Sequence, residues 1–200
     1  MEKGIIVSIQ GYSKQVTQEI ATEVENAGAV ALRIDKKVKA EIPLIGLLKA
    51  KNKEHFVEPY ITHTLDDVKS VSAWADYVAI DYRRINENIK EISEYCQAND
   101  IKVIADIASI YDFYNIMDKG YYYTFIATTL SVFGYSNPNF WLIKEIIKSE
   151  KNLIAEGNFK TSQQVRRAAK AGAYAVCIGH AITGFYKKTI EFKKGFDHEF

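Results

Sequence analysis

Residues 153–178 read LIAEGNFKTSQQVRRAAKAGAYAVCI, and they show the fold class most clearly because they hold one complete strand–helix–strand unit. Two apolar runs, Leu153–Ala155 and Ala175–Ile178, flank the unit. Between them, the capping-box pattern Thr161-x-x-Gln164 predicts the start of a helix, and Gly172 predicts its end. Apolar runs that are continuous rather than alternating indicate strands buried on both faces of a parallel sheet.

The same unit recurs along the whole chain. Such repetition fits either an open doubly wound sheet or a closed barrel. Eight strand runs in one uninterrupted series favour closure, so the sequence predicts a single domain over residues 1–200, an α/β fold of the (β/α)8 TIM-barrel type. The six runs that precede the quoted stretch are Gly4–Ile9, Ala29–Ile34, Leu44–Leu48, Tyr77–Ile80, Lys102–Ala105 and Thr124–Ala127.

Element boundaries can also be predicted. Only Asp35–Ile42 separates the second and third runs, which is too little for a normal crossover helix, so we expect a shortened second βα unit. The pair Asn137-Pro138 predicts a cap followed by the first position of a helix over Asn139–Lys148. Gly28 and Gly120 are placed to end two further helices.

Composition limits the class of protein. The chain has 200 residues, at the short end for an eight-unit barrel, and its 48% hydrophobic residues can fill one core. A formal net charge of +1 gives no strong field to attract nucleic acid or an anionic membrane. We expect Cys96 and Cys177 to be reduced core residues. The sequence from Met1 runs directly into a strand without room for a signal peptide, so we expect a cytoplasmic protein.

Polar residues follow the apolar runs, at the strand ends where barrel enzymes carry their active sites. Five of these residues are charged at neutral pH. Each alone is explained by a structural ion pair, but their common position favours a functional mouth. The residues are Gln10, Arg33, Lys49, Asp81, Asp106, Thr128, Glu156 with Gly157 and Asn158, and Gly179 with His180.

The residue types at these ends indicate proton-transfer chemistry. Burial at the rim disfavours the ammonium form of Lys49, as a general base or Schiff-base former requires; the alternative is an inert ion pair with Asp106. Glu156 can exchange a proton with a bound substrate. Asp106 can orient or tune Lys49, and Arg33 can hold an anionic or carbonyl oxygen. We expect Asp81 to contribute to substrate binding.

The last two strand ends predict a phosphate site. Gly157-Asn158 follows the seventh run, and Gly179-His180-Ala181 follows the eighth and opens a helix. Barrels often bind phosphate at this place through backbone N–H groups. The other histidines, His55, His63 and His198, have no ligand-like spacing, so we expect neither a metal nor another cofactor.

From Ile5 to about Thr183 the chain resembles the N-acetylmannosamine-6-phosphate 2-epimerases. The order and spacing of the motifs, rather than any single one, carry this resemblance. They are Val7-Ser-Ile-Gln10, Gly28-Ala-Val-Ala-Leu-Arg33, Pro43-Leu-Ile-Gly-Leu-Leu-Lys49, Tyr60-Ile-Thr-His-Thr64, Val78-Ala-Ile-Asp81, Ile104-Ala-Asp-Ile-Ala-Ser109, Thr128-Thr-Leu130, Ile154-Ala-Glu-Gly-Asn158 and Gly179-His-Ala-Ile-Thr183.

The resemblance implies a (β/α)8 enzyme that interconverts N-acetylmannosamine 6-phosphate and N-acetylglucosamine 6-phosphate without a metal or nucleotide. It implies that Lys49 is the catalytic lysine and Glu156 its acid/base partner. Both follow strands that we place on opposite sides of the ring, which suits proton removal from one face of C2 and return to the other. The resemblance further implies a homodimer. It assigns the sugar and its N-acetyl group to Gln10, Arg33 and Asp106, with Thr128 in a substrate-contacting motif, and the phosphate to Asn158 and the Gly179 loop.

The chain departs from the family pattern mainly around the entrance and the phosphate loop. Ala50-Lys51 stands where the family has Arg-Asp, His180 where it has glycine or serine, and Gly184-Phe185 where it has Arg-Pro. These departures leave two alternatives open. One is a catalytically altered barrel that binds a sugar phosphate in a regulatory role. The other is an enzyme acting on another phosphorylated small molecule, with Tyr82, Phe133 and Tyr135 lining the site.

Overall fold

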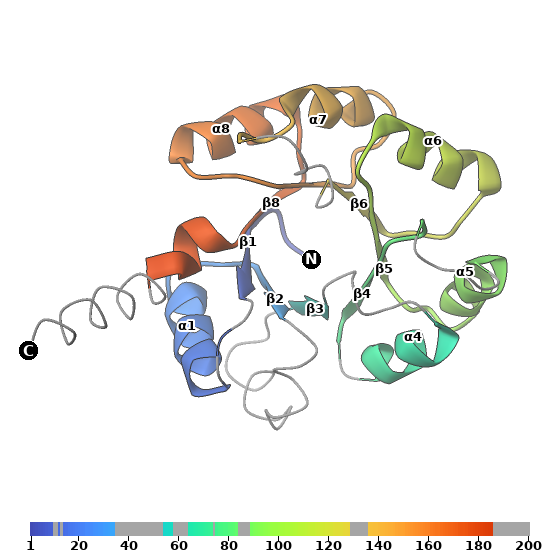
Figure 1. Ribbon diagram of the computed structural model, residues 1–200, viewed down its shortest axis with the longest axis horizontal. Helices are drawn as coiled ribbons and strands as arrows, with labels where there is room; N and C mark the ends of the chain where they lie inside the picture. The colour runs from blue at the N-terminus through green and yellow to red at the C-terminus, as the bar shows by residue number, and fades with distance from the viewer. Residues whose placement is uncertain are drawn as a thin grey trace, which may run out of the picture.

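The structure is a computed structural model that describes residues 1–9, 12, 14–34, 54–57, 64–73, 75–83, 89–128 and 136–185. Eight parallel strands form a closed barrel in chain order, and the first pairs with the last (Figure 1). The strands are β1 (Gly4–Ile9), β2 (Ala31–Ile34), β3 (Glu54–Val57), β4 (Tyr77–Ile80), β5 (Val103–Asp106), β6 (Phe125–Ala127), β7 (Leu153–Glu156) and β8 (Ala175–Ile178).

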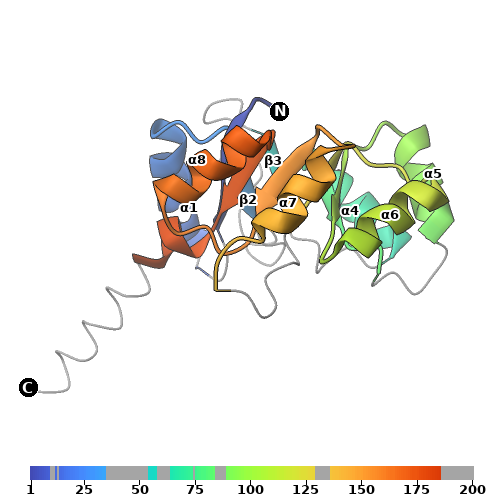
Figure 2. The ribbon, with the colours of Figure 1, turned by 90° about the horizontal axis from the view of Figure 1, so that it is seen from above.

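Helices lie outside this ring, as both ribbon views show (Figures 1 and 2). The predicted (β/α)8 barrel fold is therefore confirmed. The described helices are α1 (Lys14–Asn26), α4 (Leu65–Ser72), α5 (Ile89–Ala98), α6 (Ile110–Lys119), α7 (Phe140–Ile147) and α8 (Ser162–Ala171).

The third strand corrects the sequence prediction. We expected it at Leu44–Leu48, but the strand that pairs with both β2 and β4 is Glu54–Val57. A search for continuous apolar runs passes over this segment because two of its four residues, Glu54 and His55, are polar. Residues 35–53, which contain the expected strand and the expected short second unit, lie outside the described residues.

The helix ends follow local hydrogen-bond chemistry. The predicted capping box of α8 is confirmed, since the Thr161 hydroxyl accepts from the Gln164 N–H and Gln164 reaches back to the Thr161 N–H. Gly172 ends α8 at φ 107°, a left-handed conformation that favours glycine. The α7 cap was predicted two residues too early: Asn139, not Asn137, accepts the Leu142 N–H at 3.1 Å, so Pro138 precedes the cap.

The barrel interior closes at its amino-terminal end with aromatic side chains. Tyr77 packs edge-on against Phe125, and Phe125 packs against Tyr174. The amino group of Met1 donates to the Tyr77 hydroxyl at 3.1 Å, while the Tyr174 hydroxyl donates to the Met1 carbonyl. These contacts cover the interior at this end, and the polar residues lie at the opposite, carboxyl-terminal end, which we call the mouth.

Side chains along each strand alternate between the interior and the helix layer. Ile6, Ala79, Ile104 and Ile154 belong to the interior cluster, whereas their neighbours pack against helices. The next interior position on each of these strands, toward the carboxyl end, is polar. The fold thus places an apolar interior below a layer of polar side chains.

Candidate active site

The polar layer consists of buried side chains at the carboxyl ends of five strands. Its members are almost completely inaccessible to solvent, and they are Ser8, Arg33, Asp81, Asp106 and Glu156. Four of them were predicted from the sequence as strand-end residues. The structure brings three of these, Arg33, Asp106 and Glu156, into direct contact.

Arg33 links two carboxylates across the barrel. Its guanidinium Nη1 donates to Oε2 of Glu156, and Nη2 donates to Oδ2 of Asp106 at 3.2 Å. The side chains of Arg33 and Asp106 are 0% exposed, and that of Glu156 is 12% exposed. Because β2, β5 and β7 supply these residues, their contact depends on closure of the barrel.

The cluster joins one guanidinium to two carboxylates in a buried site. A buried ion pair repays the loss of hydration only when its geometry is good, and removing one partner from such a pair is strongly unfavourable. The three side chains therefore hold one another in place at this end of the barrel.

Thr128 fixes the backbone that carries Glu156. Its hydroxyl donates to the Glu156 carbonyl at 2.9 Å and accepts from the Glu156 N–H at 2.9 Å. This pair of bonds continues the pairing of β6 with β7 beyond the last backbone partners. Thr128 is thus a positioning residue for Glu156, and its predicted contact with substrate stays a prediction.

Asp81 holds an arginine that sequence reasoning missed. Arg83 donates to Asp81 Oδ1 from Nε at 2.9 Å and to Oδ2 from Nη2 at 3.0 Å. Its backbone N–H also donates to Oδ1, at 3.1 Å. Hydrogen bonds to Asp81 are the main cause of the raised pKa of Arg83, and the charges of Asp112 and Asp106 act in the same direction. The predicted role of Asp81 in substrate binding remains a prediction.

The loop after β7 turns sharply at the mouth. Gly157 (φ 102°) and Asn158 (φ 58°) both adopt left-handed backbone conformations, which the missing Cβ of glycine and the short amide of asparagine tolerate. The chain therefore bends directly beyond Glu156. Whether either residue binds phosphate stays a prediction.

The loop after β8 opens a helical segment, residues 180–185. The Gly179 carbonyl accepts the N–H groups of Ile182 at 2.9 Å and Thr183 at 3.0 Å. His180 is exposed, and its ring lies so close to Gly184 that a Cβ there would come within 2.9 Å of it. Two departures from the family pattern, at positions 180 and 184, are therefore sterically linked.

Two predicted site residues, Gln10 and Lys49, lie outside the described residues, as do Phe133 and Tyr135. Tyr82 is described, and it is not at the mouth. Its ring is buried and stacks on Tyr121 at 5.2 Å, and its hydroxyl donates to the Tyr122 carbonyl at 2.6 Å. Burial raises its pKa strongly. Tyr82 is a packing residue of the helix layer.

Among the described residues of this end, Ser8 and Arg83 were not singled out from the sequence. Ser8 lies inside the β1 run, two positions beyond the interior residue Ile6, so strand alternation is the signal that could have found it. It faces Gly179, where an added Cβ would lie 3.5 Å from the Ser8 Cβ. Arg83 lies beyond the strand end, and no periodicity marks it.

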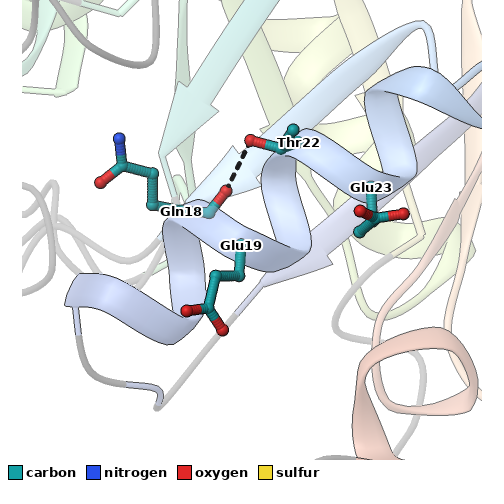
Figure 3. A pocket seen from close by; sticks show the side chains of 4 residues that line it. All are labelled: Gln18, Glu19, Thr22 and Glu23. Carbon is teal, nitrogen blue, oxygen red and sulfur yellow. Dashed lines mark hydrogen bonds between the residues drawn. The ribbon is translucent and has the colours of Figure 1, made fainter.

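Other surface features of the described residues carry no converging chemistry. A shallow depression on α1 is lined by Gln18, Glu19, Thr22 and Glu23, and the Thr22 hydroxyl is bonded to the Gln18 carbonyl within the helix (Figure 3). A second, mainly apolar depression lies beside α8 and includes Phe159 and Ile182. Among the described helices, none combines the length and apolar character needed to cross a membrane.

Comparison with known proteins identifies relatives over almost the whole chain. The family described as "Putative N-acetylmannosamine-6-phosphate epimerase" matches residues 17–197. A protein of that type from Caldanaerobacter subterraneus subsp. tengcongensis is 33% identical, with 96% of this chain and 90% of the relative covered. One from Cutibacterium acnes is 32% identical, with 92% and 89% covered.

Solved structures agree on the fold. The N-acetylmannosamine-6-phosphate 2-epimerase from Clostridium perfringens has a TM-score of 0.80 at 22% identity, covering 96% of this chain and 92% of that one. A 3-hexulose-6-phosphate synthase has a TM-score of 0.70 at 18% identity, with 92% of both chains covered. With the profile match and the sequence relatives, the conclusion is that this chain belongs to the N-acetylmannosamine-6-phosphate epimerase family.

Proposed function

We propose that this protein is an isomerase that interconverts N-acetylmannosamine 6-phosphate and N-acetylglucosamine 6-phosphate by moving the proton at C2. The observation that carries the proposal is the buried contact of Arg33 with Asp106 and Glu156 at the carboxyl-terminal end of the barrel. Family membership supplies the substrate class. The two together favour amino-sugar phosphate chemistry over the regulatory and other-substrate alternatives.

The chemistry requires acid–base groups at one carbon. In the open-chain sugar, the C2 proton is adjacent to the C1 carbonyl, so its removal gives a planar enolate. A proton returned to the opposite face produces the other epimer. Glu156 is the proposed acid/base on one face, because its carboxylate ends β7 within the polar layer and its backbone is fixed by Thr128.

Lys49 is the proposed second acid/base. Its support is the match of Pro43-Leu-Ile-Gly-Leu-Leu-Lys49 to the family motif. The described third strand begins at Glu54, after Lys49 in the chain, so the expected place of Lys49 at the end of that strand does not support this role. A protonated lysine can return a proton to the enolate on the face opposite Glu156.

Arg33 and Asp106 are proposed to prepare the site for this exchange. The guanidinium is held by Asp106 and directed at the Glu156 carboxylate, so it fixes the position of the proton acceptor before substrate arrives. Positioning of this kind contributes because the reacting groups need no rearrangement in the transition state. We assign Gln10 to the sugar and the Gly157–Asn158 and Gly179–His180 loops to the phosphate.

This scheme needs no metal or nucleotide, since the carbonyl of the substrate itself acidifies the C2 proton. Cofactor independence is therefore part of the proposal, as are a cytoplasmic location and a homodimer. A small-molecule sugar phosphate is the proposed partner.

The direct test is incubation of the purified protein with N-acetylmannosamine 6-phosphate, followed by proton NMR of the anomeric signals. The expected result is conversion to a mixture with N-acetylglucosamine 6-phosphate, approached from either epimer. Thermal stabilisation by the sugar phosphate without conversion would indicate that the protein binds this ligand but does not catalyse its conversion. If the sugar phosphate neither stabilised the protein nor was converted, the proposed substrate class would be wrong.

A further inference from the structure

Arg83 forms a second cationic position at the mouth, separate from Arg33. Two of its five N–H groups are bound by the Asp81 carboxylate in a bidentate arrangement. Asp81 is 0% exposed and belongs to the inward-facing polar layer, so this contact ties the guanidinium to the layer. The side chain of Arg83 is nevertheless 39% exposed.

The end of this guanidinium that does not bind Asp81 is Nη1. It forms an ion pair with Asp112 Oδ2 at 3.8 Å, which is beyond hydrogen-bond distance. Asp112 is itself engaged, because its Oδ2 accepts the Ala108 and Ser109 N–H groups at 2.9 Å at the start of α6. Within the described ranges, therefore, Nη1 has donors available for a group that enters the mouth.

The strand order fixes where this donor lies. In a closed ring of eight strands, β4 is opposite β8, and the proposed phosphate loops follow β7 and β8. The pairing of Ala79 with Ile104 and Ile80 with Ala105 extends to bring Asp81 beside Asp106. Arg83 thus stands across the mouth from the phosphate loops and beside the Arg33 cluster.

We propose that Arg83 binds the C1 oxygen of the open-chain sugar and stabilises the negative charge that develops there when the C2 proton leaves. A sugar held by its 6-phosphate at the β7 and β8 loops presents its other end, C1, toward β4. A guanidinium already held by Asp81 needs no reorientation to receive the charge. Arg83 forms no covalent bond: the C2 proton passes to Glu156 or Lys49, the C2–H electron pair becomes the C1–C2 double bond of the enolate, and the carbonyl electron pair moves to O1 beside Nη1. This inference rests on the proposed function.

The test uses Arg83→Gln, Arg83→Lys and the control Arg166→Gln, which alters an exposed arginine on α8. We expect Arg83→Gln to lower kcat by about 100-fold, the effect of losing one oxyanion donor. Arg83→Lys should retain part of the rate, and Arg166→Gln should match the wild type. Calorimetric affinity for inorganic phosphate should be unchanged in all three, because Arg83 lies opposite the phosphate loops.

Three results would overturn the proposal. The first is that Arg83→Gln has the same kcat and KM as the wild type, which would mean that Arg83 serves only to pair with Asp81. The second is a parallel loss of phosphate affinity, which would place Arg83 at the phosphate. The third concerns binding, and it applies if the wild type does not convert the substrate, a result that defeats the proposed function alone. Arg83→Gln should then still weaken binding of N-acetylmannosamine 6-phosphate, measured by calorimetry, at least about fivefold. Equal binding by the wild type and Arg83→Gln would defeat the Arg83 assignment too.

Discussion

At the scale of single residues, the site is governed by the burial of Arg33. An exposed ion pair contributes little, because water screens it and two flexible side chains must be ordered. The Arg33 cluster differs because neither the guanidinium nor the Asp106 carboxylate is exposed. The same geometry that prepares the site for chemistry therefore makes it a point on which folding depends.

Replacing Arg33 by methionine should lower the free energy of unfolding by about 3–5 kcal/mol, because two buried carboxylates lose their compensating charge. Urea denaturation followed by circular dichroism measures this change. The matched control is Lys148→Met, which breaks the exposed 2.6 Å pair with Glu145 and should change stability by less than about 1 kcal/mol. Similar small losses in both variants would contradict the burial argument.

Most residues of the polar layer could be predicted from the sequence. Arg33, Asp81, Asp106 and Glu156 were predicted because each follows an apolar run, and a strand of known direction fixes which end of a barrel such a residue occupies. Arg83 was missed because it lies beyond its strand, where no periodicity constrains side-chain direction. Its contact with Asp81 depends on a turn whose shape single residues do not determine.

At the scale of elements, the α8 unit shows how local signals set boundaries. The capping box and the left-handed Gly172 were both predictable, since each needs only residues within one turn of the helix. The α7 start was not, because Asn137 and Asn139 are both good caps and the choice depends on how the preceding loop packs. The third strand was predicted at the wrong place because two of its residues are polar and a more apolar run precedes it in the chain.

Thr161→Ala should lower the free energy of unfolding by about 0.5–2 kcal/mol, because the Gln164 N–H at the start of α8 loses its acceptor. Thermal and urea denaturation provide the measurement. Thr22→Ala is the control: this exposed hydroxyl bonds to the Gln18 carbonyl inside α1, and alanine favours the helix. If both variants lost stability equally, the capping box would have no special role.

The buried thiol of Cys96 on α5 makes the stability of the protein depend on pH. Burial raises the pKa of its thiol from 9.0 to about 11, so the folded protein retains the thiol proton more tightly than the unfolded chain. This contribution to stability is complete below pH 9 and is lost as pH rises through 11. Urea denaturation should show a smaller loss of stability between pH 8 and pH 10.5 in Cys96→Ala than in the wild type. An identical loss of stability in Cys96→Ala and the wild type would contradict the raised pKa of Cys96.

At the scale of the whole molecule, barrel closure converts separate strand ends into a site. Arg33, Asp106 and Glu156 are far apart in the chain, and only a ring with β1 paired to β8 brings them together. Eight repeated units were sufficient to predict the ring, but not which polar side chains meet inside it. Those contacts depend on side-chain length and register across the interior, which one strand alone does not determine.

The proposed exchange of the C2 proton by Glu156 can be followed by isotope incorporation. N-acetylmannosamine 6-phosphate is incubated in D2O with the wild type and with Glu156→Gln, which keeps the shape of the side chain but removes its carboxylate. The prediction is deuterium at C2 of the product formed by the wild type. Glu156→Gln should lose exchange by at least about 100-fold while remaining folded. Wild-type product that keeps protium at C2, or a Glu156→Gln variant that exchanges at the normal rate, would contradict the claim.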